Sequence, residues 1–112
     1  MRGGAIFIFD NINIQIDQSQ FEYNDADITG SCMFIKNEGR SIVEIRKTEF
    51  KYNTNQCIKL YKSQDTSISI IDSLFMNNSI YSLNDTKGAA LNLHEYLSVS
   101  IRNSRFESNV AL

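Results

Sequence analysis

The sequence predicts an all-β protein in which one chain winds into a single-stranded parallel β-helix of about four rungs. Three observations predict this fold. The motif hydroxyl–x–Phe–x–x–Asn occurs four times along the 112 residues. The residues before each copy alternate between apolar and polar with a period of two, which is typical of strands and not of helices. When the copies are aligned, like residues fall in the same columns, and this self-similarity is the signature of a solenoid.

The four motif copies define the predicted rungs. They occupy residues 19–24, 48–53, 73–78 and 104–109. The corresponding rungs are 3–24, 30–53, 55–78 and 88–109. A chain of this length is about one domain, so residues 1–112 are interpreted as a single β-helix segment. Each rung should contain three short strands separated by polar or glycine-containing turns.

The first strand of each rung should carry two apolar columns that face the core. The first column contains Ile6, Met33, Ile58 and Leu91, and the second contains Ile8, Ile35, Leu60 and Leu93. Side chains alternate faces along a strand, so the residues between these columns should point to solvent. Those residues are Phe7, Phe34, Lys59 and Asn92.

The second strand repeats the pattern with β-branched residues, which suit a packed sheet. Its inward columns are Ile14, Val43, Ile68 and Val99, then Ile16, Ile45, Ile70 and Ile101. In the third strand the inward hydroxyl and phenylalanine belong to the motif, and Phe21, Phe50, Phe75 and Phe106 should stack as a ladder. The asparagine that ends each motif should form the closing turn, because Asn tolerates left-handed geometry, and the four amides should hydrogen-bond from rung to rung.

A sandwich of β-hairpins is the rival fold. Strands that recur at one position per rung must run parallel to their copies, whereas a sandwich needs no such columns. The Asn-Gly and Asp-Gly turns typical of two-residue hairpins are absent from the sequence. The sequence therefore favours the β-helix.

Composition excludes several functions. The net charge of −2 argues against a nucleic-acid partner. No apolar run approaches the length of a transmembrane helix, and the N-terminus lacks the apolar core of a signal peptide. Cys32 and Cys57 fall in one column of adjacent rungs, where Ala5 and Ala90 also lie. We expect buried free thiols there, with a cross-rung disulfide as the alternative.

The repeat motifs resemble those of a known protein family. Residues Gly3-Gly4-Ala5-Ile6 together with Phe-x-x-Asn resemble the paired repeat motif of the polymorphic outer-membrane protein family, whose members are surface autotransporter passengers, and of other pectate-lyase-like (pectin lyase-like) β-helix proteins. The glycine element is complete only in rung one, whereas Phe-x-x-Asn is present in all four. The resemblance implies a right-handed coil, an extracellular or cell-surface location and an adhesin-like structural role with a glycan or protein partner.

The resemblance also implies that any membrane attachment lies in another part of a parent chain. We expect the sequence to be a fragment of a longer solenoid, because neither end carries a recognisable polar cap. The alternative is a fragment of a polysaccharide lyase or glycoside hydrolase whose catalytic rungs lie outside this segment.

Catalysis within this segment is not expected. Paired-carboxylate chemistry needs two acids about 5 to 10 Å apart. Asp10 aligns with Glu95, and Glu22 with Glu107, but three rungs, or about 14 Å, separate each pair. His94 is the only histidine and has no partner at metal-ligand spacing, so we expect neither a metal nor another cofactor.

The candidate functional residues lie in two surface features, an aromatic strip and a pair of glycosylation sequons. An exposed aromatic strip on the first sheet should contain Phe7, Phe9, Phe34, Tyr61 and His94, and exposed aromatic surface favours a glycan or protein contact. The alternative is that neighbouring loops cover it. Two glycosylation sequons place acceptors at Asn77 and Asn84, around the longest connection, residues 79–87. Chance occurrence of these sequons stays open, because Asn, Ser and Thr are abundant.

Overall fold

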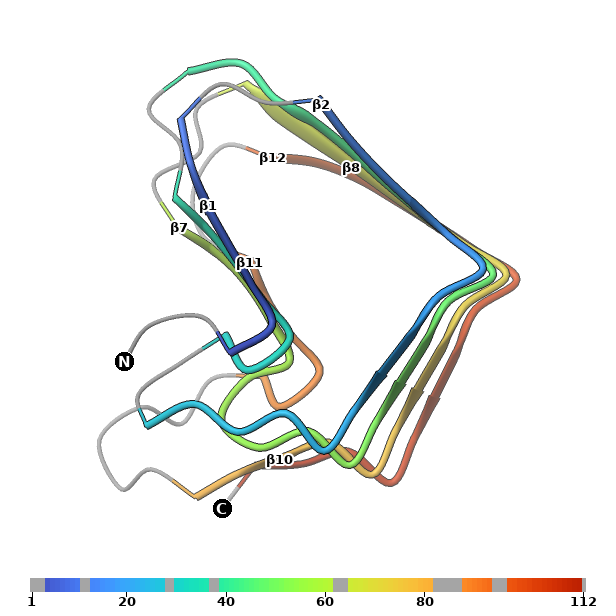
Figure 1. Ribbon diagram of the computed structural model, residues 1–112. Helices are drawn as coiled ribbons and strands as arrows, with labels where there is room; N and C mark the ends of the chain where they lie inside the picture. Colours follow the sequence, from blue (N-terminus) through green and yellow to red (C-terminus); the bar gives the residue numbers. More distant parts are fainter. Residues whose placement is uncertain are drawn as a thin grey trace.

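A computed structural model of the chain describes residues 4–10, 13–27, 30–36, 39–61, 65–81, 88–93 and 97–111. Within these ranges the regular structure is entirely β, with no helix. The chain follows the same angular path repeatedly, so that strands from successive rungs lie over one another (Figure 1). The fold is therefore a parallel β-solenoid, as the sequence predicts.

Three four-stranded parallel sheets form the walls of the solenoid. The first sheet contains β1 (Ile6–Phe9), β4 (Met33–Lys36), β7 (Ile58–Tyr61) and β11 (Leu91–Leu93). The second contains β2 (Asn13–Asp17), β5 (Ile42–Arg46), β8 (Thr66–Ile71) and β12 (Leu97–Arg102). The third contains β3 (Gln20–Glu22), β6 (Glu49–Lys51), β9 (Leu74–Met76) and β13 (Arg105–Glu107).

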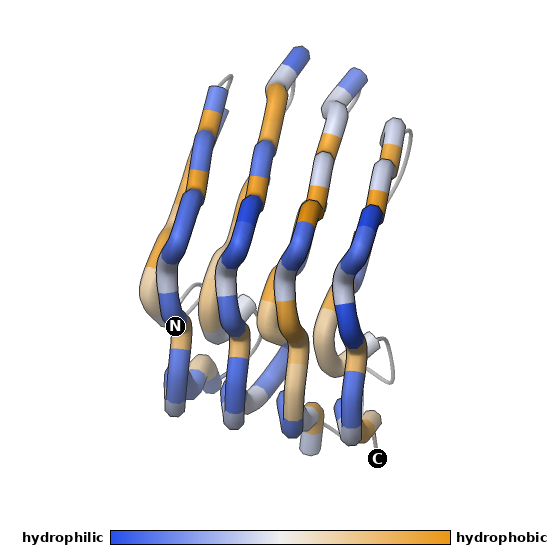
Figure 2. The backbone as a smooth tube through the Cα atoms, turned by 90° about the vertical axis from the view of Figure 1, so that its right-hand side faces the viewer, coloured by the Kyte–Doolittle hydropathy of each residue, from blue (hydrophilic) through white to orange (hydrophobic). Residues whose placement is uncertain are grey.

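The register within these sheets is the one that the sequence columns predict. In the first sheet Met33 pairs with both Ile6 and Ile58. In the third sheet Phe50 pairs with both Phe21 and Phe75. All of these pairings are parallel, which confirms the solenoid and excludes the hairpin sandwich. Along the second and third sheets, hydrophobic and hydrophilic residues alternate at matching levels in neighbouring rungs (Figure 2).

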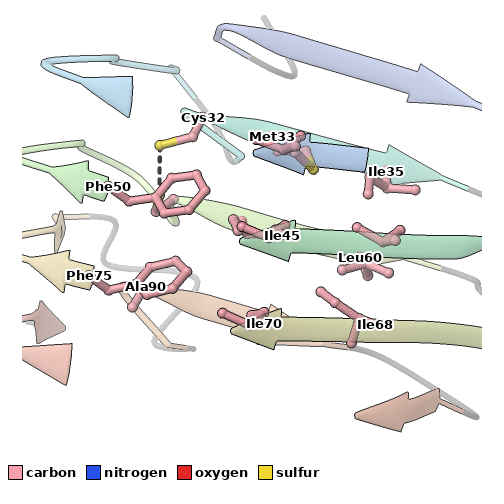
Figure 3. Close-up of a cluster of buried hydrophobic side chains, with 14 of the residues drawn as sticks. Cys32, Met33, Ile35, Ile45, Phe50, Leu60, Ile68, Ile70, Phe75 and Ala90 are labelled. Carbon is pink, nitrogen blue, oxygen red and sulfur yellow. Dashed lines mark hydrogen bonds between the residues drawn. The ribbon is translucent and has the colours of Figure 1, made fainter. Parts of the chain in front are cut away.

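The core is continuous through the stack. Its central members come from the predicted inward columns and are completely or almost completely buried, as Figure 3 shows for Ile35, Ile45, Leu60, Ile68 and Ile70. The phenylalanine rings stack as predicted, with centroids 5.0 Å apart for Phe21–Phe50, 4.6 Å for Phe50–Phe75 and 4.7 Å for Phe75–Phe106. Phe106 is 43% exposed because only one neighbouring ring covers it.

Two corners of each rung use left-handed backbone geometry. Gln18, Lys47, Asp72 and Asn103 precede the third strands, with φ from 47° to 51°. Tyr23, Tyr52, Asn77 and Ser108 follow them, with φ from 50° to 55°. At the closing turn that the sequence predicted, the left-handed residue is the one before the motif asparagine and not the asparagine itself. The asparagine keeps a negative φ, and its amide joins the ladder between rungs.

The left-handed corners explain why the motif needs a hydroxyl and an amide. The N–H of Lys47 donates to the Ile71 carbonyl at 3.0 Å, and the next N–H, of Thr48, points to the same rung and donates to Ser73 Oγ at 3.2 Å. Two successive backbone N–H groups thus point toward the same neighbouring rung. The first donates to a backbone carbonyl, and the second donates to a side-chain hydroxyl oxygen. A buried N–H without a partner is costly, so the corner selects an oxygen-bearing side chain.

The asparagine ladder, which the sequence predicted, fills the same role at the other corner. The Asn53 backbone N–H donates to Asn78 Oδ1 at 3.1 Å. Asn53 Nδ2 donates to Asn78 Oδ1 at 2.9 Å and to the Phe21 carbonyl at 2.9 Å. Asn24 Nδ2 in turn donates to Asn53 Oδ1 at 3.0 Å. Each interior amide therefore uses both of its donor hydrogens and its acceptor oxygen.

A short fourth ladder follows the asparagines and was not predicted. Strand β10 (Ser79–Ile80) pairs in parallel with β14 (Val110–Ala111). Isolated parallel bridges join Thr54 to both Asp25 and Ser79. The first residues of the connections between rungs are thus held in register with one another before the connections diverge.

Candidate functional site

The candidate site is the outer face of the first sheet. Phe7 and Phe9 alternate with inward residues along β1, and Tyr61 ends β7, so all three rings point outward. Phe7 is 52% exposed, Phe9 54% and Tyr61 37%. Register places Lys59 in the row of Phe7 and Lys36 between Phe9 and Tyr61. We call Phe7, Phe9, Lys36, Lys59 and Tyr61 the aromatic face.

Two contacts stabilise the arrangement of this face. The Lys36 ammonium lies 5.1 Å from the centroid of the Phe9 ring, within the range of a cation–π interaction. The Phe7 ring stacks on that of Phe34, with centroids 5.4 Å apart and planes 3° from parallel. Both exposed phenylalanines therefore pack against a side chain from the next rung.

The expected exposure of Phe34 was wrong. It points outward, but only 3% of its surface is exposed. Gly30, the first residue of rung two, packs against it, and a Cβ on Gly30 would lie 2.8 Å from Phe34 Cβ. Ala26 and Ile80, in connections between rungs, are buried outside the main core cluster. Phe34 is thus enclosed by Gly30 and the Phe7 ring, and it does not contribute to the exposed surface.

Three other residues were predicted as site residues, and none of them belongs to the aromatic face as the structure describes it. His94 and Asn84 lie outside the described residues. Asn77 is half-buried at a left-handed corner, with a φ of 54°. Its N–H donates to the Glu107 carbonyl at 3.0 Å, so the sequon Asn77-Asn78-Ser79 belongs to the hydrogen-bonded coil. Glycosylation at Asn77 stays a prediction.

A groove of about 830 Å³ lies where the chain passes from the first sheet to the second. Its described lining consists of Arg40, Ser41, Ile42, Asp65, Thr66, Ser67 and Ser98. Arg40 and Asp65 provide charges of opposite sign, four hydroxyl groups provide donors and acceptors, and half-exposed Ile42 provides apolar surface. Only one carboxylate is among these residues, whereas paired-acid hydrolysis needs two.

The groove was not predicted, although the lengths of the segments that lead into the second sheet indicate it. Phe9 and Lys36 are equivalent in register, and so are Asn13 and Ile42. The chain nevertheless uses two more residues between Lys36 and Ile42 than between Phe9 and Asn13. Longer insertions in a solenoid often mark a binding side.

The pKa shifts of Glu49 and Cys57 arise from an ion pair and from burial in the core, both away from the aromatic face. Lys51 beside Glu49 lowers the pKa of that carboxyl, but the pair lies on the third sheet, away from the aromatic face. Burial raises the pKa of the Cys57 thiol in the core. No group of three or more His, Cys, Asp or Glu side chains suited to a metal occurs among the described residues. That part of the chain also contains no helix able to cross a bilayer.

No protein-family model, curated protein or solved structure matches this chain. Planar rings on strands can stack against the apolar face of a sugar or against an apolar side chain, and the neighbouring ammonium groups can donate hydrogen bonds.

Proposed function

We propose that this chain is a non-catalytic structural and adhesive solenoid whose aromatic face binds a glycan or a protein at a cell surface. The observation that carries the proposal is the exposure of three aromatic rings on one face of one sheet. Exposed aromatic surface of this kind marks interaction sites. The extracellular setting rests on the resemblance of the repeats to those of surface proteins.

The rigidity of the aromatic face supports a binding role. Strands β1, β4 and β7 are paired along their lengths, so the backbone that carries the rings is fixed. Phe9 already contacts Lys36, and Phe7 already contacts Phe34. A ligand therefore binds without a large cost for ordering these side chains. Lys36 also adds a positive charge beside the rings, which favours ligands with acidic or hydroxyl groups.

The experiment is a binding screen followed by matched variants. The wild-type chain is applied to an array of neutral and acidic oligosaccharides and to immobilised cell-surface proteins. The hits are then measured with a triple variant carrying Phe7→Ala, Phe9→Ala and Tyr61→Ala. We expect affinity to fall at least about tenfold, because aromatic side chains are enriched among the residues that dominate binding energy.

The control variant carries Tyr23→Ala and Tyr52→Ala. These tyrosines are exposed and stack on each other at 5.1 Å, but they lie at the corner after the third strands. Their removal should leave binding unchanged. The proposal is wrong if the triple variant binds every hit as the wild type does, or if both variants lose affinity equally.

The groove supports a second candidate function that differs from the fragment alternative above, namely cleavage of a polysaccharide within this segment itself. Arg40 and Asp65 line it together with hydroxyl groups. Incubation with plant and bacterial polysaccharides, followed by assay for new reducing ends and unsaturated products, distinguishes the candidates. We expect no turnover by the wild-type chain. Turnover abolished by Asp65→Asn would instead support the enzyme.

A further inference from the structure

Two cysteines meet in the core between rungs two and three. Cys32 precedes β4 and Cys57 precedes β7, and both side chains are completely buried. No disulfide joins them here, yet their Sγ atoms lie only 2.6 Å apart (Figure 3). This separation exceeds the covalent S–S bond of about 2.05 Å by little more than half an ångström.

The backbone around this pair is suited to a cross-link. Cys32 N–H donates to the Cys57 carbonyl at 3.0 Å, so the two residues occupy adjacent rungs of one ladder. Adjacent strands lie about 4.8 Å apart, inside the Cα separation of about 4.4 to 6.8 Å that disulfides span. Both side chains point to the same inward face. The sulfurs can therefore bond without displacing either strand.

We propose that Cys32 and Cys57 form a cross-rung disulfide when the chain folds in the presence of a small-molecule disulfide. One cysteine thiolate attacks the small disulfide, forms a mixed disulfide and releases one small thiol. The second cysteine thiolate then attacks the protein sulfur of that mixed disulfide, forms the Cys32–Cys57 bond and releases the second small thiol. The two cysteines lose two electrons and two protons, and the reagent gains them.

The burial of the pair determines when the bond forms. Burial raises the pKa of the Cys57 thiol, so little reactive thiolate is present in the folded chain. The reagent also has no exposed sulfur to contact. Exchange therefore proceeds while the chain is unfolded or partly open, and folding then selects the intramolecular bond. Once formed, the bond is protected from reduction for the same reason.

The test refolds the full chain in a buffer of oxidised and reduced glutathione and counts thiols after denaturation. The bond predicts zero titratable thiols, a mass lower by two hydrogens, and a Tm higher by on the order of 10 °C than that of the reduced protein, since the bond closes a loop of about 25 residues. Two remaining thiols, a stable glutathione adduct or a disulfide-linked dimer would each overturn the proposal.

Two rearranged variants keep two thiols and test the geometry. Cys32→Ala with Ala90→Cys again places the thiols in adjacent rungs of the same column, because Cys57 and Ala90 precede paired strands. This variant should also cross-link. Cys57→Ala with Ala90→Cys separates the thiols by two rungs, about 9.6 Å, and should keep both thiols titratable. Equal cross-linking of the two variants would show that collision of unfolded chains, and not the column, determines the bond.

Discussion

Each residue type that recurs in the internal repeat has a defined structural role at or between the corners of the coil. The hydroxyl residue supplies an oxygen to an N–H that faces the next rung, and it donates to a carbonyl of its own rung, as Ser73 does to Ile71 at 2.9 Å. The asparagine performs the same task at the next corner and adds two donor hydrogens. The phenylalanine fills the core between them. The motif spacing therefore follows from the length of one three-residue strand between two corners.

The asparagine ladder gives a prediction for a single side chain. Asn53→Ala removes a buried amide that bonds Asn24, Asn78 and the Phe21 carbonyl. Buried partners left unsatisfied cost about 1 to 3 kcal/mol each, partly offset by water, so we expect a loss of about 2 to 4 kcal/mol in the free energy of unfolding. Chemical denaturation measures this value.

The matched control is Asn24→Ala, at the end of the same ladder. Its side chain donates one hydrogen bond, to Asn53 Oδ1. Its loss should cost about 1 kcal/mol. Equal losses for the two variants would contradict a cooperative ladder in which interior amides matter most.

At the scale of strands and connections, the period-two pattern predicted which side chains face the core. It could not predict contacts between segments that are distant in the sequence. Alternation along β1 and β4 identified which side chains face inward, and the register confirmed it. Alternation could not reveal that Gly30 packs against Phe34, because that contact depends on the path of the chain before β4. The fourth ladder at Thr54 was also missed, since its residues share no apolar pattern.

The phenylalanine ladder supplies the prediction for the third sheet. Phe50 is fully buried between Phe21 and Phe75. Phe50→Ala should therefore reduce the free energy of unfolding by about 3 to 5 kcal/mol, through lost burial and a cavity. Phe106→Ala removes the same ring from a half-exposed position and should cost about 1 to 2 kcal/mol. Thermal or urea unfolding compares them, and a smaller loss at Phe50 than at Phe106 would contradict the stacked core.

At the scale of the whole molecule, the sequence predicted the architecture better than the surface. The inward columns follow from physical constraints that every rung shares, so four copies reinforce one another. The aromatic face and the groove depend on residues that differ between rungs, such as Phe9, Lys36 and Tyr61 in one row. Because these residues differ from rung to rung, comparison of the repeats cannot predict their role. The right-handed sense of the coil, the cell-surface setting and the adhesive role stay predictions.

In this fold, residues one rung apart lie directly over one another in parallel strands. Nuclear Overhauser contacts in a ¹³C,¹⁵N-labelled sample test it most directly. We expect contacts from the Phe50 ring to the rings of both Phe21 and Phe75, whose centroids lie 5.0 and 4.6 Å away. Close Hα–Hα contacts between these strands, typical of antiparallel pairs, or a Phe50 ring without contact to either neighbour, would contradict it.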